Sequence, residues 1–335
     1  MIDLQPVLDA YQIIPTKVEK VTDRVFKIHT NYRIYALKHT SLSDQQLGHW
    51  QAVHHFLDQR KVLGFLPVFF TVAGDPFVTN QQSIFYLMPW VESFPHERPT
   101  DEWTSFFHAL GKLHASTLQL IELDQQKQNQ AEYQAYFHSE MKRNSDELLQ
   151  YIRLFEAKRF MSPVELQACM YYRDMEWVLE ETEKWQQVYL DALEKSDKTS
   201  IVLCHGNLDP THYIMTNNQT YFLNWEHAQM ASPVHDLISF LLFNFQYHDC
   251  QINKLKEGLR IYFQYIPFGD LEKSQLALQL LSMEKYMHCL KAHNTPNKQT
   301  VIYESIRFEK EYRKLLFSIQ LSEDLFSTIQ QVEMD

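Results

Sequence analysis

Ionisable and amide side chains gather in residues 201–240, which read IVLCHGNLDPTHYIMTNNQTYFLNWEHAQMASPVHDLISF. Within this stretch, the carboxylates Asp209 and Glu226 could together hold a metal ion or supply a catalytic base. The simpler interpretation is that Asp209 caps a turn before Pro210 and that Glu226 is a polar loop residue. The residues alone leave both interpretations open.

The same stretch is rich in histidine, which is a common zinc ligand. No two of these histidines form an HxxxH pair, which would bring them to one face of a helix, so we predict no metal site. They are His205, His212, His227 and His235.

Short β-branched and aromatic segments are typical of the first 89 residues. The first three segments predict a three-stranded meander. A helix capped by Ser41 or Ser43 is expected next, followed by two more strands. The strands are expected over 18–21, 25–29, 33–38, 65–72 and 83–88, and the helix over 43–60. The order βββαββ indicates a small sheet with one helix.

Residues 89–99 contain three prolines, and 90–99 are interpreted as a linker, after which the pattern becomes helical. We therefore predict a β-rich N-terminal lobe (1–89), a linker (90–99) and a helical C-terminal lobe (100–335). Helices are expected from Thr100 onward and over 130–157, 163–194, 234–246, 252–264, 271–293 and 297–317, interrupted by a strand at 201–204 and a hairpin of 213–215 with 221–225.

Several segments, in this order, resemble the aminoglycoside phosphotransferase and choline kinase-like superfamily. His205-Gly206-Asn207 stands where the family pattern reads HGDxxxxN, and a hairpin and a helix opening with Asp-Leu follow, as in the family. The other segments are Tyr35-Ala36-Leu37-Lys38, Tyr86-Leu87-Met88-Pro89-Trp90 and Leu110-Gly111-Lys112-Leu113-His114. The resemblance implies a two-lobe, protein kinase-like α+β fold with a small β-rich N-terminal lobe and a large helical C-terminal lobe.

The resemblance also implies an active centre for phosphoryl transfer to a hydroxyl group. Lys38 falls on the phosphate-pairing lysine and Asn207 on the catalytic carboxylate. The two metal ligands fall on His212 and Asn224. An amide cannot accept the proton of a hydroxyl group, and magnesium prefers anionic oxygen to amide or imidazole. The chain is therefore expected to be catalytically degenerate, to bind no magnesium and to be no enzyme.

The N-terminal lobe departs from the family pattern at its phosphate-binding elements. The turn Thr22-Asp23-Arg24 has no glycine, and Asp23 would place a negative charge near the phosphates. The helix over 43–60 contains no glutamate to pair with Lys38, and His54 stands close to the level where that glutamate is expected. Lys38 is therefore expected to be either solvated or differently paired.

What the chain keeps of the family pattern is architectural. His205 and Gly206 begin the loop, and the resemblance implies that Asp236, at the start of the next helix, holds that loop by accepting backbone hydrogen bonds. A cleft beside Lys38 and Met88 is expected to persist and to bind ATP weakly, with little dependence on magnesium. A fold kept without the charged groups of its reaction indicates a scaffold.

Composition excludes other classes of protein. The 335 residues include 31 basic and 42 acidic ones, for a net charge of −11, so binding to nucleic acid or to an anionic membrane surface is not expected. Glycine occurs 7 times in 335 residues, a fraction well below the roughly 7% that is usual. This low glycine content favours a mostly helical protein. The 4 cysteines form no CxxC pair, which is typical of reduced thiols in a cytoplasmic protein. The chain starts without a basic, apolar leader, and we predict a soluble protein that is not exported.

Within the superfamily, the segments TDRVFKIHT and LCHGNLDPTHYI resemble the CotS/YsxE-type spore-coat proteins of endospore-forming bacilli. This resemblance implies a structural or assembly role during sporulation, with other spore-coat proteins as partners. It further implies synthesis in the mother-cell cytoplasm and a final place in the spore coat. Two alternatives stay open: an active small-molecule phosphotransferase that uses Asp209 and Glu226 as relocated carboxylates, and a nucleotide-binding switch without turnover.

Overall fold

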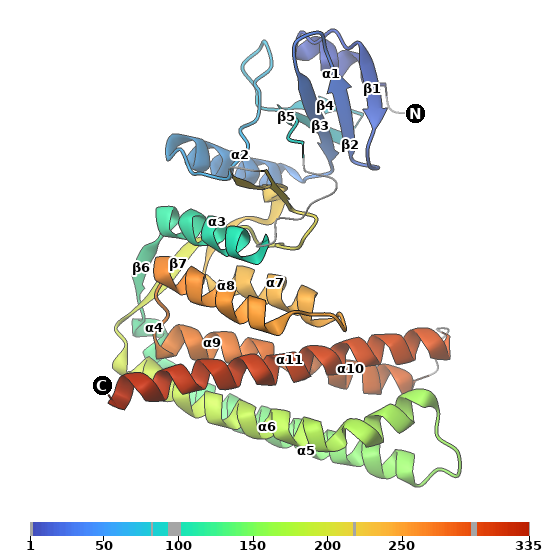
Figure 1. Ribbon diagram of the computed structural model, residues 1–335, viewed down its shortest axis with the longest axis vertical. Coiled ribbons are helices and arrows are strands. Elements are labelled where there is room, and N and C mark those ends of the chain that lie inside the picture. Colours follow the sequence, from blue (N-terminus) through green and yellow to red (C-terminus); the bar gives the residue numbers. More distant parts are fainter. Residues whose placement is uncertain (1–2, 82, 93–101, 217–218, 296–299, 335) are drawn as a thin grey trace. The chain divides into compact units, whose positions relative to one another are not determined.

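The computed structural model describes residues 3–81, 83–92, 102–216, 219–295 and 300–334, and Figure 1 shows its ribbon. The chain forms two compact units. Residues 1–117 with 203–230 make up the first unit, and residues 118–202 with 231–335 make up the second. Of the predicted linker 90–99, residues 93–99 lie outside the described part of the chain.

A five-stranded antiparallel sheet forms the N-terminal part of the first unit, with the strand order β1-β2-β3-β5-β4. Its strands are β1 (Lys17–Lys20), β2 (Val25–His29), β3 (Ile34–Thr40), β4 (Val78–Asn80) and β5 (Ser83–Pro89). The predicted meander of the first three strands is confirmed. In the register of β3 with β5, Lys38 lies opposite Tyr86, which places the lysine in the middle of the sheet.

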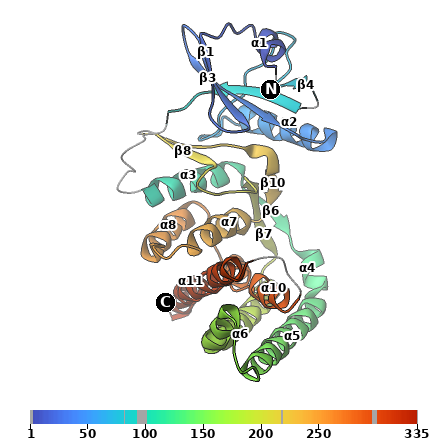
Figure 2. The same ribbon diagram turned by 90° about the vertical axis from the view of Figure 1, so that its right-hand side faces the viewer.

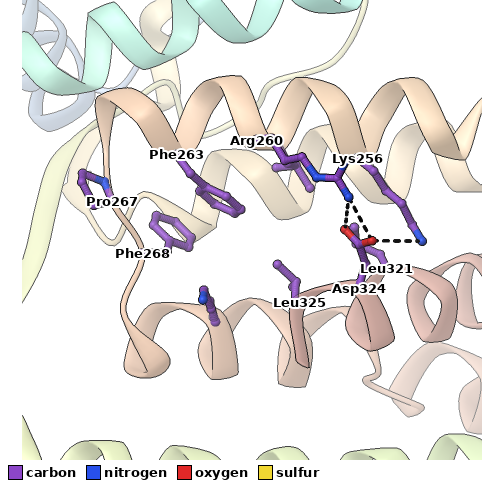
Figure 3. A pocket seen from close by; sticks show the side chains of 10 residues that line it. Lys256, Arg260, Phe263, Pro267, Phe268, Leu321, Asp324 and Leu325 are labelled. Carbon is purple, nitrogen blue, oxygen red and sulfur yellow. Dashed lines mark hydrogen bonds and ion pairs between the residues drawn. The ribbon is translucent and has the colours of Figure 1, made fainter. Parts of the chain in front are cut away.

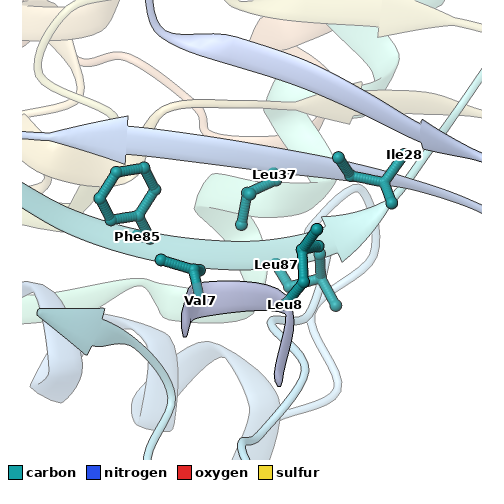
Figure 4. Packing of buried hydrophobic residues seen from close by; sticks show 6 residues of the cluster. All are labelled: Val7, Leu8, Ile28, Leu37, Phe85 and Leu87. Atoms are coloured by element: carbon teal, nitrogen blue, oxygen red, sulfur yellow. The ribbon is translucent and has the colours of Figure 1, made fainter. Parts of the chain in front are cut away.

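Helix α1 (Gln5–Ala10), which the sequence patterns did not predict, packs on this sheet. Its Val7 and Leu8 are buried against four sheet residues, and Figure 4 shows the cluster. The sheet residues are Ile28, Leu37, Phe85 and Leu87. Burial of this apolar surface fixes α1 to the sheet, because the helix itself is too short to be stable alone.

Helix α2 (Asp44–Gln59) begins after Ser43, whose side chain forms a capping box with Gln46, so the predicted cap is confirmed for Ser43. The strand predicted over 65–72 is wrong. Phe65 and Phe69 make only single bridges, and β4 at 78–80 takes the edge of the sheet instead. Pro67 has no N–H group to donate, which explains why no ladder forms there.

The first unit is completed by helix α3 (Glu102–Thr117) and by the segment 203–230. This segment contains the predicted hairpin, whose strands are β8 (Tyr213–Met215) and β9 (Thr220–Phe222), and a single 3₁₀ turn, η1 (Trp225–His227). It then enters β10 (Gln229–Ala231).

Helices dominate the second unit. Figure 2 shows the long α5 and α6 running beside each other, and the pair β6 and β7 is antiparallel. The elements are β6 (Gln119–Glu122), α4 (Asp124–Gln128), α5 (Gln130–Glu156), α6 (Pro163–Lys195), β7 (Lys198–Cys204), α7 (Val234–Phe245), α8 (Ile252–Tyr265), α9 (Asp270–Leu280), α10 (Glu284–His293) and α11 (Val301–Met334). No helix in the described ranges is long and apolar enough to cross a membrane.

Two helix predictions in this unit are wrong. The helix expected over 271–293 is divided into α9 and α10. Leu281 and Met283 in the break are buried, so the apolar pattern continues through it and did not reveal it in the sequence. The helix expected to end at 317 continues to Met334. The part of that prediction over 297–299 lies outside the described residues.

Candidate functional site

Lys38 of β3 is buried, with 8% of its surface exposed, so the expectation of a solvated lysine is wrong and that of a different partner is right. Its ammonium donates a hydrogen bond to Glu226 Oε1 at 2.7 Å and another to Asn224 Oδ1. The ammonium also lies 5.6 Å from the centre of the Tyr86 ring, which adds a cation–π contact. A carboxylate from η1 thus replaces the glutamate that α2 lacks.

Glu226 is buried rather than a polar loop residue. Besides the lysine, it accepts a hydrogen bond from the Tyr86 hydroxyl at 3.2 Å. Burial raises the pKa of the Glu226 carboxyl, but the neighbouring Lys38 charge and hydrogen bonds from Lys38, Thr40 and Tyr86 outweigh burial and hold the pKa below its ordinary value. Glu226 is therefore ionised at neutral pH, and its charge is matched by Lys38.

Hydrogen bonds continue from Lys38 to the other degenerate positions. Asn224 turns its Oδ1 to the ammonium, so its Nδ2 group can only donate, and it does so to His212 Nε2 at 3.1 Å. His212 then carries its hydrogen on Nδ1 and donates to the backbone oxygen of Asn207 at 2.6 Å. We call the side chains of Tyr86, Glu226, Lys38, Asn224 and His212, with this backbone oxygen, the Lys38 network.

The Lys38 network uses the atoms that a metal would need. The imidazole lone pair of His212 is taken by Asn224, and the amide oxygen of Asn224 is taken by Lys38. The one carboxylate of the network, Glu226, is neutralised by the same lysine. These residues therefore do not fit Mg²⁺, which requires oxygen ligands, usually with a carboxylate among them.

Asp209 makes the turn contacts that the simpler interpretation expected. Its Oδ1 accepts hydrogen bonds from the backbone N–H and the hydroxyl of Thr211, at 2.7 and 2.6 Å. Its Oδ2 lies 3.4 Å from His212 Nδ1. The carboxylate is thus occupied by its own loop.

The backbone of the loop is held by His205 and Gly206. His205 is fully buried, donates from Nε2 to the backbone oxygen of Leu223 at 2.5 Å, and accepts from the backbone N–H of Asn207 at 3.4 Å. Gly206 has a φ of +81°, and a Cβ there would lie 2.0 Å from the backbone oxygen of His227. Asp236 is buried in the first turn of α7 in the second unit, as expected for a helix N-terminus.

The substitution Gly206→Ala is expected to lower the free energy of unfolding by about 3 kcal/mol, because left-handed strain and a backbone clash add up at this position. Gly74→Ala is the matched control, since Gly74 has a φ of +89° with no atom within 4 Å of a built Cβ. Urea denaturation of both variants measures the difference. Equal losses at the two positions would show that the close approach to His227 contributes nothing.

The position of the missing helical glutamate is filled by aromatic packing. The ring of His54 in α2 packs at a tilt against Trp50, with 4.2 Å between ring centroids, and edge-on against Phe65 at 5.0 Å. Burial, aided by the nearby Lys38 charge, lowers the pKa of His54 to about 3, so the ring is neutral. This neutral cluster explains why α2 can lie beside Lys38 without a carboxylate.

A cavity of about 750 Å³ opens beside Lys38 in the first unit. Both predicted cleft residues, Lys38 and Met88, line it. Arg24, Lys27 and Trp90 also line it, and the sequence alone did not identify them as cleft residues. The alternation of side chains along β2, which places Lys27 on the same face as Val25, is the signal that could have found the second cation.

The charge of this cavity differs from the expectation. Asp23 points away from it: the side chain is 96% exposed and pairs with Lys20 at 2.8 Å, whereas the next residue, Arg24, lines the cavity. Lys27 lies over the Trp90 ring at 4.6 Å and within 3.4 Å of Glu92. Because Lys38 is paired with Glu226, the charges left at the cavity are the cations Arg24 and Lys27 and the carboxylate Glu92, and this surplus of one positive charge favours an anionic occupant.

The model of the phosphotransferase enzyme family matches residues 18–265. This match covers well over half of the chain, so the fold is that of the phosphotransferase class and the chain belongs to this phosphotransferase enzyme family. No curated protein matches the chain significantly.

Solved structures agree on the fold. An aminoglycoside phosphotransferase from Alicyclobacillus acidocaldarius is 15% identical, with 98% of this chain and 96% of that chain covered and a TM-score of 0.70. Spectinomycin phosphotransferase in complex with ADP and spectinomycin is 12% identical, with 94% and 96% covered and a TM-score of 0.54. Amicoumacin kinase in complex with AMP-PNP and Ca²⁺ is 13% identical, with 92% of each chain covered and a TM-score of 0.51. The predicted kinase-like α+β fold is confirmed.

Proposed function

We propose that this protein keeps the phosphotransferase fold but transfers no phosphate. The observation that carries the proposal is the closed Lys38 network, in which Asn224 accepts a hydrogen bond from Lys38 and donates one to His212. Phosphoryl transfer needs metal ligands, a lysine for the phosphates and a base for the acceptor. In this chain the lysine is held by Glu226, and the position of the base is an amide, Asn207.

The alternative of relocated carboxylates has little support in the geometry. Glu226 is the charge partner of Lys38, and Asp209 is bound by Thr211. A base must be able to take up a proton near neutral pH, whereas the pair with Lys38 lowers the pKa of Glu226 below the ordinary value of a carboxyl, further from neutrality. Neither carboxylate is therefore arranged as a base for a substrate hydroxyl.

Thermal unfolding with ATP, with and without Mg²⁺, tests this proposal. We expect that any stabilisation by ATP is unchanged by Mg²⁺ or by a chelator, because no metal site completes the phosphate site. The matched variant Asn207→Asp, His212→Asn, Asn224→Asp restores the family residues and is expected to gain a magnesium-dependent shift. A magnesium-dependent shift in the unmodified protein, abolished by chelator, would overturn the proposal.

The role that remains for such a fold is structural, and we propose assembly into the spore coat. The support is the resemblance of residues 22–30 and 203–214 to spore-coat proteins, together with the absence of a complete reaction centre in the described residues. The partners would be other coat proteins, and the place of synthesis the mother-cell cytoplasm. The net charge of −11 would keep the protein dispersed before assembly and favour basic partner surfaces.

Fluorescently tagged variants in sporulating cells test this role. Asn207→Ala and Asn224→Ala are expected to leave localisation at the coat intact. Reversal of charge at Glu176, Glu180 and Glu183, which are exposed on α6, is expected to weaken it. If the asparagine variants stay folded and lose localisation, the cleft rather than the surface is the functional site.

The cationic cavity supports a second candidate, a binding protein without turnover. Arg24 and Lys27 line it, so they can partly neutralise an anion such as a nucleotide without a divalent metal, while Lys38 stays paired with Glu226. Calorimetric titration with ATP, in the presence of a chelator that removes divalent metal ions, tests this function. Lys27→Met should weaken binding about tenfold, since a charge-assisted contact is lost, whereas Lys112→Met, at an exposed lysine of α3, should not.

A further inference from the structure

The second unit contains a cavity of about 240 Å³ that has no part in the Lys38 site. It lies between α8, the segment 266–269, the start of α9 and α11 (Figure 3). All of its lining residues belong to the second unit, so its shape depends on that unit alone.

One end of this cavity is apolar. Figure 3 shows Phe263 and Phe268 next to each other, with Leu325 below them, and the two ring centroids are 4.9 Å apart. Leu259 and Leu321 add aliphatic surface. These walls can bury the ring or the alkyl chain of a small molecule, which is favourable in proportion to the apolar area removed from water.

The other end carries an ion pair that is already complete. Arg260 donates to both carboxylate oxygens of Asp324, at 3.2 and 3.4 Å, and Lys256 lies 3.9 Å from the same carboxylate. Asp324 is the carboxylate among the lining residues. The negative charge of Asp324 is thus shared by Arg260 and Lys256, and it is not available to a third cation.

The third cation is Lys273, in the second turn of α9. Among the described residues, no hydrogen bond or ion pair is made by its ammonium, and Asp270 influences it only from beyond ion-pair distance. Lys273 is half-buried, and this burial lowers the pKa of its ammonium. A partly desolvated cation beside apolar walls is stabilised by an anion that brings its own apolar part.

We infer that this cavity binds a small organic monocarboxylate, whose ring or chain packs on Phe263 and Phe268 and whose carboxylate pairs with Lys273. One unpaired cation calls for one negative charge. Since a cavity of about 150 Å³ accommodates benzene, a cavity 240 Å³ in volume accommodates a molecule of about ten non-hydrogen atoms. Phenylacetate has this size and both of the required parts.

Calorimetric titration of the full chain at low salt, with phenylacetate and phenylacetamide, tests the inference. The two molecules have the same size, and only the first is charged. We expect phenylacetate to bind about tenfold more tightly or better, because a charge-assisted contact is worth at least that factor. Equal affinities, or no binding of phenylacetate at millimolar concentration, would overturn the inference.

Two variants locate the site. Lys273→Met keeps the length of the side chain and should remove the preference for phenylacetate, whereas Lys254→Met, at an exposed lysine of α8 outside the cavity, should leave it unchanged. Phe268→Leu should weaken the binding of both molecules. Thermal unfolding of each variant verifies its fold, and a preference that survives in folded Lys273→Met protein would place the anion elsewhere.

Discussion

No phosphoryl transfer above background is expected when the purified protein is incubated with ATP, Mg²⁺ and hydroxyl acceptors such as aminoglycosides or choline. A missing base at Asn207 removes a contribution of about 10²–10⁴-fold, and the engaged metal positions His212 and Asn224 remove more. The measurement is phosphate transfer from labelled ATP over long incubation. Spectinomycin phosphotransferase with spectinomycin is a suitable positive control for the assay.

Two variants distinguish true inactivity from a relocated reaction centre. Asp209→Asn and Glu226→Gln remove the two carboxylates that could have taken over as base or metal ligand. If the protein shows magnesium-dependent turnover and either variant abolishes it, the proposal of inactivity fails. The alternative of an active phosphotransferase would then hold.

Breaking the Lys38–Glu226 pair is expected to lower the free energy of unfolding by about 3–5 kcal/mol, because it leaves one buried charge without its partner. The side chains are 10% and 5% exposed, and the two residues are 188 positions apart in the chain. Lys38→Met and Glu226→Leu are the single variants, and urea denaturation is the measurement. The double variant should recover most of the loss, because apolar groups of similar size then replace both charges.

Lys20→Met is the control for this experiment, because Lys20 pairs with Asp23 on the surface of the same unit and should change stability little. If the losses of the two single variants simply add in the double variant, Lys38 and Glu226 do not interact energetically. The Lys38 network would then lose its central contact.

Acid pH provides an independent readout of the same pair. The pKa of Glu226 is lowered in the folded protein, chiefly by Lys38, and returns to its ordinary value on unfolding. A carboxyl with a lowered pKa stabilises the fold fully above the unfolded value, and this stabilisation is lost as pH falls through the folded value. The difference in stability between the unmodified protein and Glu226→Gln should therefore shrink below about pH 4.5. A constant difference through this range would show that the charge of Glu226 does not stabilise the fold.

Local patterns in the sequence predicted the parts of this protein that depend on short stretches of chain. The meander of the first three strands, the Ser43 cap and most helices follow from spacing over a few residues, and the structure confirms them. The family resemblance depended on short motifs such as His205-Gly206-Asn207, and the kinase-like α+β fold is confirmed. The amides at Asn207 and Asn224 are likewise visible in the sequence without any structure.

Long-range contacts decided the rest. The sequence left Glu226 open between a loop residue and a relocated carboxylate, and Lys38 between a solvated and a differently paired lysine, because no local pattern relates residues 188 positions apart. The conformation of the Thr22-Asp23-Arg24 turn determined which charge lines the cavity. Arg24 lines it, whereas the neighbouring Asp23 is exposed and pairs with Lys20. Residue types and their local spacing are thus set by the chain itself. Burial and the pairing of charges depend on which distant segments the folded sheet and helices bring together.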